Sequence, residues 1–355
     1  MKKIVRIIIG KRLYAHLLYA RHHHRLLSIN GIENRRAEGE NAYLAKWHRL
    51  SMLVEPYSYR LFSRFCGPNP DIIPEDILHL IVEPAIAPRR YWEEYEDKNN
   101  FSKIVGSDCV PQTVLFRQHG CQHGSIDMLH DCRYGSLILK ASLNSSCGEG
   151  ILKFDRAGEE YRTEDGRLLT QELLDSYGTD FVLQEAVEQH EFMSQFNHTS
   201  VNTLRLAIYR RVEDDRTIVT AAVMRIGVVG SHVDNVLAGG RYVSVDVATG
   251  KLGCYTATHL GQITEVWNGI DFSRNNFYVP GWDRVLQLAG DVGRCLHRTR
   301  LAALDIALRM DGSPVLIEYN IGGFSSFLYH FTGQTVFGKY TDEVVSLIAQ
   351  RRRFR

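Results

Sequence analysis

Hydrophobic and polar positions divide the chain into a helical N-terminal part and a longer part built from short strands. Over residues 41–95 apolar positions recur at helical spacing, with breaks at CGPNPDIIPED and EPAIAP. From about residue 98 onward short β-rich runs follow one another, among them GSLILKASL, TLRLAIYRR and TIVTAAVMRIG, with helical stretches between some of them. Mixed strands and helices with several hairpins predict an α+β fold rather than a parallel, doubly wound sheet.

The first 28 residues have the pattern of a basic amphipathic helix. Leu13, Leu17 and Leu18 share one face, and basic residues and histidines occupy the rest. Such a helix either packs on its own domain or lies on an anionic membrane surface as a peripheral contact. We expect the packed arrangement, with the three consecutive histidines at positions 22–24 in solvent.

Composition and charge exclude several classes of protein. Hydrophobic residues make up 44% of the chain and charged residues 23%, and the net charge of +1 gives no electrostatic reason to expect nucleic acid as a partner. The seven cysteines are odd in number, scattered and without a C-x-x-C pair, which indicates free thiols in a reducing compartment, the cytoplasm. No run approaches the roughly 20 apolar residues of a membrane span, and the basic N-terminus does not resemble a signal peptide.

The stretch LAALDIALRMDGSPVLIEYNIGGFSSF, residues 301–327, carries the clearest chemistry. Asp311 and Gly312 between two apolar runs predict a hairpin. Glu318 and Asn320 are two apart and share a strand face, which Asp305 can reach from the partner strand. Three oxygen donors on one face suit Mg²⁺. The alternative is a pair of unrelated exposed carboxylates on an edge hairpin.

The spacing of Asp305, Glu318 and Asn320 resembles the magnesium signature of the ATP-grasp superfamily. Upstream, EDKNNFSKIVGSDCVPQT, LILKASLNSSCGEGILKF and FVLQEAVEQHEF resemble three further ATP-grasp segments in the expected order. Together with SVNTLRLAIYRR and MRIGVVGSHVDNVLAGGRYVSVDVATGKL, they resemble the sugar-transfer associated branch. The resemblance implies two α+β lobes gripping ATP, at residues 96–185 and 186–355, after a mainly helical region at residues 1–95.

The resemblance implies an ATP site and assigns residues to it. Lys140, which ends an apolar strand and is awkward to bury without a partner, and Lys98 would neutralise phosphate oxygens. Small residues would let the backbone of a loop approach phosphate, and these are Ser145, Ser146 and Gly148. The hinge that would meet adenine consists of Gln184, Glu185, Ala186 and Val187. The acid that would hold ribose is Glu191. Lys98 and Glu191 have simpler alternatives, as an exposed lysine in a charged run and a solvated residue at a helix start.

Three arginines and a glycine-serine loop complete the expected site. Arginine clamps phosphate or carboxylate groups and can stabilise a transition state. Amide-forming relatives often carry an arginine two residues before the first metal aspartate, but this chain has Ala303 there, so that role comes from elsewhere or the chemistry differs. The expected catalytic residues are Arg205, Arg225 and Arg241, and the expected substrate contacts are Asn235, Gly322, Gly323, Ser325 and Ser326. For Asn235 an Asx turn is an equal alternative.

The segment RQHGCQHGSIDMLHDC, residues 117–132, invites a zinc interpretation through its histidines and cysteines. Its spacings match no standard structural zinc site. We therefore expect a surface hairpin in this segment.

Three functions remain open at this point. The first is an ATP- and Mg²⁺-dependent carboxylate–amine ligase that forms an amide through an acyl phosphate, acting on a sugar acid or its nucleotide conjugate in capsule or surface polysaccharide synthesis. The second is a kinase that phosphorylates a sugar hydroxyl. The third is a non-catalytic nucleotide-binding scaffold. The sequence leaves the acid, the amine and the oligomeric state undetermined.

Overall fold

The computed structural model describes residues 10–143, 150–230, 239–274 and 276–353. Within these ranges the chain forms two antiparallel sheets of six and seven strands, a two-stranded ribbon, and a set of helices. The expected α+β fold is therefore confirmed. Four expected site residues, Ser145, Ser146, Gly148 and Asn235, lie outside the described residues.

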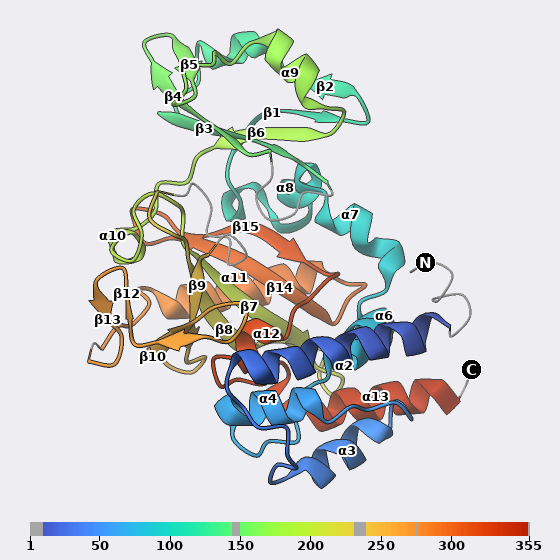
Figure 1. Cartoon of the computed structure of the whole chain (residues 1–355). Helices are drawn as coiled ribbons and strands as arrows, with labels where there is room; N and C mark the ends of the chain where they lie inside the picture. Colours follow the sequence, from blue (N-terminus) through green and yellow to red (C-terminus); the bar gives the residue numbers. More distant parts are fainter. Residues whose placement is uncertain (1–9, 144–149, 231–238, 275, 354–355) are drawn as a thin grey trace.

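The six-stranded sheet forms the uppermost part of the molecule (Figure 1). Its strand order is β2-β1-β6-β3-β4-β5, with every pair antiparallel. Leu137, Leu139, Phe154, Phe181 and Leu183 form its buried core, and helix α9 begins where the side chain of Thr170 accepts the Leu173 N–H. The elements are β1 (Thr113–Gln118), β2 (Cys121–His123), β3 (Ser136–Ala141), β4 (Leu152–Ala157), β5 (Glu160–Arg162), β6 (Phe181–Glu185) and α9 (Gln171–Tyr177).

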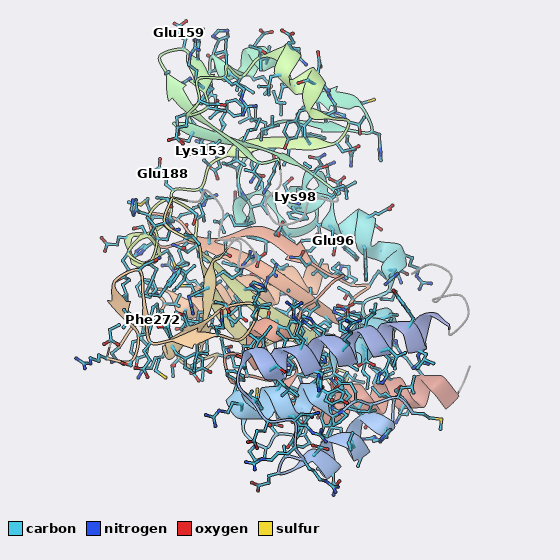
Figure 2. All side chains as sticks on the ribbon, viewed as in Figure 1. Glu96, Lys98, Lys153, Glu159, Glu188 and Phe272 are labelled. Carbon is cyan, nitrogen blue, oxygen red and sulfur yellow. The ribbon has the colours of Figure 1, made fainter. Side chains whose placement is uncertain are left out.

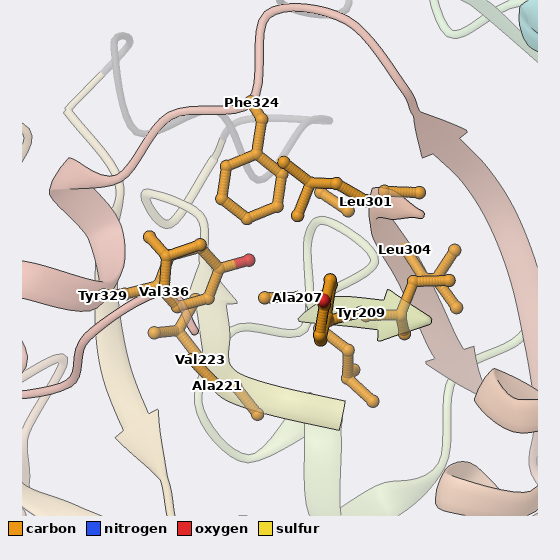
Figure 3. Close-up of a cluster of buried hydrophobic side chains, with 14 of the residues drawn as sticks. Ala207, Tyr209, Ala221, Val223, Leu301, Leu304, Phe324, Tyr329 and Val336 are labelled. Carbon is orange, nitrogen blue, oxygen red and sulfur yellow. The ribbon is translucent and has the colours of Figure 1, made fainter. Parts of the chain in front are cut away.

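The seven-stranded sheet lies below it, in the order β11-β10-β9-β8-β7-β14-β15 (Figure 1). The residues of β14 are buried throughout, as expected for a strand covered on both faces. Figure 3 shows part of the core that this sheet shares with the segment after β15, including Tyr209, Leu304, Phe324 and Tyr329. The strands are β7 (Thr203–Arg210), β8 (Thr217–Ile226), β9 (Arg241–Val245), β10 (Leu252–Ala257), β11 (Ile263–Thr264), β14 (Leu301–Leu308) and β15 (Pro314–Asn320). Around them are β12 (Val266–Trp267), β13 (Ile270–Asp271), α10 (Glu191–Ser194), α11 (Trp282–Cys295), α12 (Phe327–His330) and α13 (Thr341–Arg353).

Short helices make up most of the N-terminal region, and several lie beside the C-terminal helix α13 (Figure 1). A π-helical turn, Leu78–Val82, interrupts the run between α5 and α6, a feature that often marks functional segments. No helix of the described residues is long and apolar enough to cross a membrane. The helices are α2 (Lys11–Ile29), α3 (Glu40–His48), α4 (Tyr57–Cys66), α5 (Glu75–Ile77), α6 (Glu83–Ile86), α7 (Trp92–Glu96) and α8 (Phe101–Val105).

The expectation for the first helix was wrong in one respect. His23 is fully buried rather than solvated, and its Nδ1 lies 2.8 Å from Glu55 Oε1. Burial alone would raise the pKa of Glu55, but His23 and hydrogen bonds from Ser58 hold that pKa below its ordinary value. The leucine face at positions 13, 17 and 18 is exposed instead. A buried partner 32 residues away is invisible to helical periodicity.

We expect Gly261→Ala to lower the free energy of unfolding by more than Gly269→Ala. Both glycines have positive φ, +85° and +78°, where an alanine costs about 1–2 kcal/mol. At Gly261 an added Cβ would also lie 2.4 Å from Cε1 of Phe331, whereas nothing lies within 4 Å at Gly269. Urea denaturation of the two variants would measure the difference, and equal losses would contradict the packing described for the Gly261 turn.

Candidate functional site

Two of the three expected metal residues, Asp305 and Glu318, lie opposite each other on neighbouring strands. Strands β14 and β15 are antiparallel and place Asp305 directly opposite Glu318, and Ala303 opposite Asn320. The register shifts after Asp305, leaving Ile317 as the extra residue of a bulge. At the turn, the Asp311 carboxylate accepts the Ser313 N–H at 2.8 Å. The predicted hairpin is present, and Asp305, Glu318 and Asn320 lie together near its open end.

Two of the three expected catalytic arginines contact Asp305. Arg205 lies opposite Asp305 in the register of β7 and β14, and its Nε and a terminal nitrogen donate to the two carboxylate oxygens at 2.8 and 2.7 Å. Arg225 on β8 donates to the same carboxylate at 3.2 Å. Burial would raise the pKa of Asp305, but the two guanidinium groups hold it below its ordinary value. The cations near this aspartate thus come from neighbouring strands rather than from position 303.

The third arginine, Arg241, contacts Gln262 and Trp267 rather than Asp305 among the described residues. It donates to the Gln262 carbonyl at 3.1 Å, and its guanidinium carbon lies 4.7 Å from the centroid of the Trp267 ring. Its position in the β8–β9 register is opposite Ile226, next in sequence to Arg225. Neighbouring positions on a strand point to opposite faces, so the register places Arg241 on the face opposite Arg225.

Both expected phosphate lysines lie close to Glu318. The Lys98 ammonium is 3.5 Å from Glu318 Oε2, and the Lys98 N–H donates to the Ser142 carbonyl, just after β3. Lys140 on β3 is buried, and no described residue forms a hydrogen bond or ion pair with its ammonium. Burial, assisted by the charge of Lys98 and opposed by Glu318, lowers the pKa of Lys140 to about 8. A buried lysine that forms no ion pair with any described residue indicates a place for an anionic ligand.

The expected adenine hinge joins the two sheets. Gln184 and Glu185 are the last two residues of the fully buried strand β6. Ala186 and Val187 follow, and the Ala186 N–H donates to the Ser136 carbonyl. Glu185 also accepts a 2.5 Å hydrogen bond from Arg309, at the end of β14. This hydrogen bond fixes the hinge relative to the β14–β15 hairpin.

The expected ribose acid, Glu191, is the first residue of α10 and is exposed. The neighbouring His190 N–H donates to the Leu308 carbonyl at 2.9 Å, which attaches the start of α10 to β14. This placement is compatible with both interpretations of Glu191, a ribose contact and a solvated helix start.

Three carboxylates, the buried Glu75 and Glu83 and the half-buried Glu96, hold the loop that follows β15. Glu96 accepts the N–H groups of Ile321 and Gly322 at 2.7 and 2.9 Å. Glu83 accepts the Phe324 N–H at 2.7 Å, and Glu75 accepts the Ser326 N–H at 3.1 Å. Charge-assisted hydrogen bonds to backbone N–H groups are strong and directional. The helical region therefore fixes the backbone immediately after β15.

The glycines and serines of this loop have individual positions within that arrangement. Gly322 packs so closely on Trp92 that an added Cβ would lie 2.3 Å from the indole ring, and Gly323 has φ of +67°. The Ser325 hydroxyl lies 3.5 Å from Glu75 Oε1, and Ser326 is fully buried. The structure thus brings Gly322 next to the site and places Ser326 within the interior.

A cavity of about 410 Å³ opens beside the β14–β15 hairpin. Its wall combines the end of β15 with the segment at residues 89–98. Figure 2 labels Glu96 and Lys98, which lie between the two sheets. Its lining residues include Arg89, Arg90, Trp92, Glu96, Lys98, Glu318 and Asn320. A cavity of this size is typical of a small-molecule site.

These residues fit a divalent cation with a polyphosphate. Within the described residues no group of three or more His, Cys, Asp and Glu side chains is arranged to hold a metal, so a cation here would depend on the amide of Asn320 and on ligand oxygens. The Asn320 Nδ2 is buried and has no acceptor among the described residues, and a phosphate oxygen would supply one. Mg²⁺ commonly binds through one or two carboxylates and takes its other ligands from phosphate and water. The donor set and the two nearby lysines match that pattern.

The first part of the segment at residues 117–132 lies in a hairpin, β1 with β2, and Ile126–Leu129 forms a short 3-10 helix. Phe116 and His123 stack with ring centroids 4.5 Å apart, and no metal-binding group is found among these residues, all of which are described.

Several residues of the site escaped the sequence analysis. Arg309, Arg89, Arg90 and Trp92 had no motif to mark them. Glu75 and Glu83 did leave a signal, because they flank the apolar run ILHLIV, where a charged side chain needs a buried partner. Glu96 lies in the charged run EEYEDK and left none.

Comparison with known proteins gives one family match. The family described as sugar-transfer associated ATP-grasp matches residues 82–329. No curated protein matches the chain.

Similar solved structures include an L-amino acid ligase from Bacillus licheniformis, with a TM-score of 0.41 and 11% identity over 71% of this chain and 48% of that one. A VanG D-Ala:D-Ser ligase from Enterococcus faecalis has a TM-score of 0.40 and 14% identity over 76% of this chain and 62% of that one. The chain thus spans about half to three fifths of the length of these two proteins.

Proposed function

Because the chain belongs to the sugar-transfer associated ATP-grasp family, we propose that it is an ATP- and Mg²⁺-dependent carboxylate–amine ligase. ATP phosphorylates a substrate carboxylate, an amine attacks the acyl phosphate, and the products are an amide, ADP and phosphate. The acid is a sugar acid, either a uronic acid or its nucleotide conjugate, used in capsule or surface polysaccharide synthesis. The six described cysteines are free thiols, which supports placing the enzyme in the cytoplasm.

The observation that carries the proposal is the meeting of Lys98, Lys140 and Glu318 beside Asp305. Asp305, Glu318 and Asn320 would hold Mg²⁺, which when bound supplies positive charge to the phosphate oxygens. Lys98 and Lys140 would bind the phosphates as point charges. Catalysis of phosphoryl transfer is mostly positioning and charge neutralisation, and these residues offer both without a side-chain nucleophile.

The remaining residues have proposed roles around this centre. Arg205 and Arg225 would orient the Asp305 carboxylate, and Arg241 would be the third catalytic arginine. The nucleotide would lie against the loop at residues 144–149 and the hinge after β6, with Glu191 at ribose. The loop after Asn320 would border the acceptor.

A kinase is the second candidate because Ala303 replaces the arginine common in amide-forming relatives. Transfer of the γ-phosphoryl to a sugar hydroxyl would use the same lysines and carboxylates but form no acyl phosphate. The two chemistries differ in the fate of phosphate, which is released by a ligase and retained on the product by a kinase.

Product analysis distinguishes the candidates. The protein would be incubated with Mg·ATP, a panel of uronic acids and their nucleotide conjugates, and a pool of amino acids and amino alcohols. The ligase predicts phosphate release that requires both acid and amine, with a product lighter than their sum by one water. A product that gains a phosphate group without an amine would identify a kinase. No turnover, together with no thermal shift on adding Mg·ATP, would favour a scaffold.

ATP affinity is expected to fall as pH rises above about 8. Burial lowers the pKa of Lys140 to about 8 in the free protein, whereas a bound triphosphate favours the charged ammonium. Above that pH binding must take up a proton, so the Kd rises toward about ten-fold per pH unit. Calorimetric titration with Mg·ATP between pH 7 and 9.5 measures this slope.

Lys140→Arg is the matched control for the pH experiment, because arginine stays charged over this range. Its Kd is expected to change less with pH than that of the unmodified protein. The same slope in both proteins would show that Lys140 does not meet the phosphates.

A further inference from the structure

The cavity beside β15 has a polar character that the ATP site does not account for. Glu318, Asn320 and Lys98 form its inner side, next to the expected metal position. Its outer side comes from residues 89–96, which belong to the helical N-terminal region and not to either sheet. A ligand in this cavity would therefore have one end at the reacting centre and the other end against the helical region.

Trp92 is fixed in the cavity wall from two directions. Its Nε1 donates to the Ala87 carbonyl at 3.1 Å, and its six-membered ring lies against Gly322. Gly322 is itself held by Glu96 through its N–H group. A rigid indole in a cavity wall gives a ring-shaped ligand a large contact surface at low entropic cost.

Arg89 and Arg90 supply charge at the outer end. Both are exposed and line the cavity. Their guanidinium carbons lie 5.2 Å from the Trp92 ring centroid and 4.8 Å from that of Tyr91, respectively. Among the described residues, none forms an ion pair with either arginine. Two adjacent guanidinium groups match the charge and the planar hydrogen-bonding geometry of a phosphate.

The acidic residues that line the cavity form no ion pair with the two arginines among the described residues. Glu96 accepts the N–H groups of Ile321 and Gly322, and Glu318 lies next to Lys98. Glu93 is exposed and also lines the cavity. The lining between residues 89 and 96 thus has two arginines and two carboxylates, and both guanidinium groups can still donate to an anionic ligand group.

We infer that this cavity is the acceptor site and that the acceptor is a phosphorylated sugar acid. Its phosphate is bound by Arg89 and Arg90, its ring packs against Trp92, and its carboxylate faces the Lys98 ammonium. This inference rests on the proposed function for the orientation of the carboxylate. The phosphate recognition stands on the cavity alone.

Binding of matched acids to the full chain tests the inference. Glucuronic acid, glucuronic acid 1-phosphate and UDP-glucuronic acid would be titrated calorimetrically in the presence of Mg²⁺ and a non-hydrolysable ATP analogue. We expect the 1-phosphate to bind at least about ten-fold more tightly than the free acid. Tighter binding of the UDP conjugate would show that the phosphate belongs to a diphosphate, which supports the same site.

The variant Arg89→Gln with Arg90→Gln identifies the residues responsible. Its preference for the phosphorylated acid should fall to about two-fold or less, while Arg64→Gln, an exposed arginine on α4, should keep the full preference. An unchanged preference in the double variant, no preference in the unmodified protein, or no binding of any of the three compounds would overturn the inference.

The proposed function can fail separately from this inference. Phosphate preference is a binding ratio and needs no turnover. A protein that shows the preference but releases no phosphate with any amine would retain the acceptor site and lose the ligase proposal. A protein that releases phosphate with acid and amine but shows no preference would retain the ligase and lose the acceptor assignment.

Discussion

Replacing Glu318 with glutamine is expected to reduce Mg·ATP-dependent turnover by about 10³-fold or more while leaving the fold intact. A metal ion contributes several kcal/mol to stabilising charge in a phosphoryl-transfer transition state, and each ~1.4 kcal/mol is ten-fold in rate. Glutamine keeps the size of the side chain but removes the charge that a cation and Lys98 both require. The Glu318 side chain is 32% exposed, so little stability depends on it. Phosphate release and thermal unfolding would be measured on the same samples.

Glu159→Gln is the matched control, since Glu159 is exposed in the turn before β5, away from the hairpin (Figure 2). It should retain full turnover. If Glu318→Gln kept more than about a tenth of the activity, a metal-binding role for this carboxylate would be ruled out, because ten-fold corresponds to only ~1.4 kcal/mol.

Of the single substitutions proposed, Arg205→Met is expected to lower the free energy of unfolding the most. Asp305 is 1% exposed and receives two hydrogen bonds from Arg205 but one from Arg225. Removing Arg205 leaves Asp305 with the single hydrogen bond from Arg225, and breaking a buried ion pair typically costs about 3–5 kcal/mol. Urea denaturation at neutral pH would measure the difference from the unmodified protein.

Two further variants separate charge from packing. Arg205→Lys keeps the charge but loses the bidentate geometry. Its free energy of unfolding should therefore lie between those of the unmodified protein and Arg205→Met. The double change Arg205→Met with Asp305→Leu removes both charges and should recover part of the stability. If Arg205→Met cost less than about 1 kcal/mol, the pair would behave like a solvent-exposed ion pair, which would contradict its described burial.

The sequence was most informative where the chemistry is local. Asp311 and Gly312 mark the hairpin, and the two-residue period of a strand brings Glu318 and Asn320 to one face. Lys140 was recognisable because a lysine at the end of an apolar run needs a partner. Each of these inferences uses residues within about 15 positions of one another, over which backbone geometry limits the arrangements.

The rest of the site depends on contacts that no local pattern encodes. Glu96 holds the loop after β15 from 225 positions away in the sequence, and Arg205 meets Asp305 across 100 positions. The burial of His23 and the cavity at Arg89, Arg90 and Trp92 arise from the same long-range packing of the helical region. Periodicity finds the elements, but their mutual placement depends on the whole core.

The central claim is the acyl phosphate, and oxygen transfer tests it most directly. The acid identified by product analysis would be prepared with ¹⁸O at both carboxylate oxygens and incubated with Mg·ATP and the amine, and the released phosphate would be analysed by mass spectrometry. If the carboxylate attacks the γ-phosphorus and the amine then expels phosphate, each phosphate carries one ¹⁸O. Released phosphate without ¹⁸O, despite amide formation, would contradict the acyl phosphate and with it the proposed mechanism.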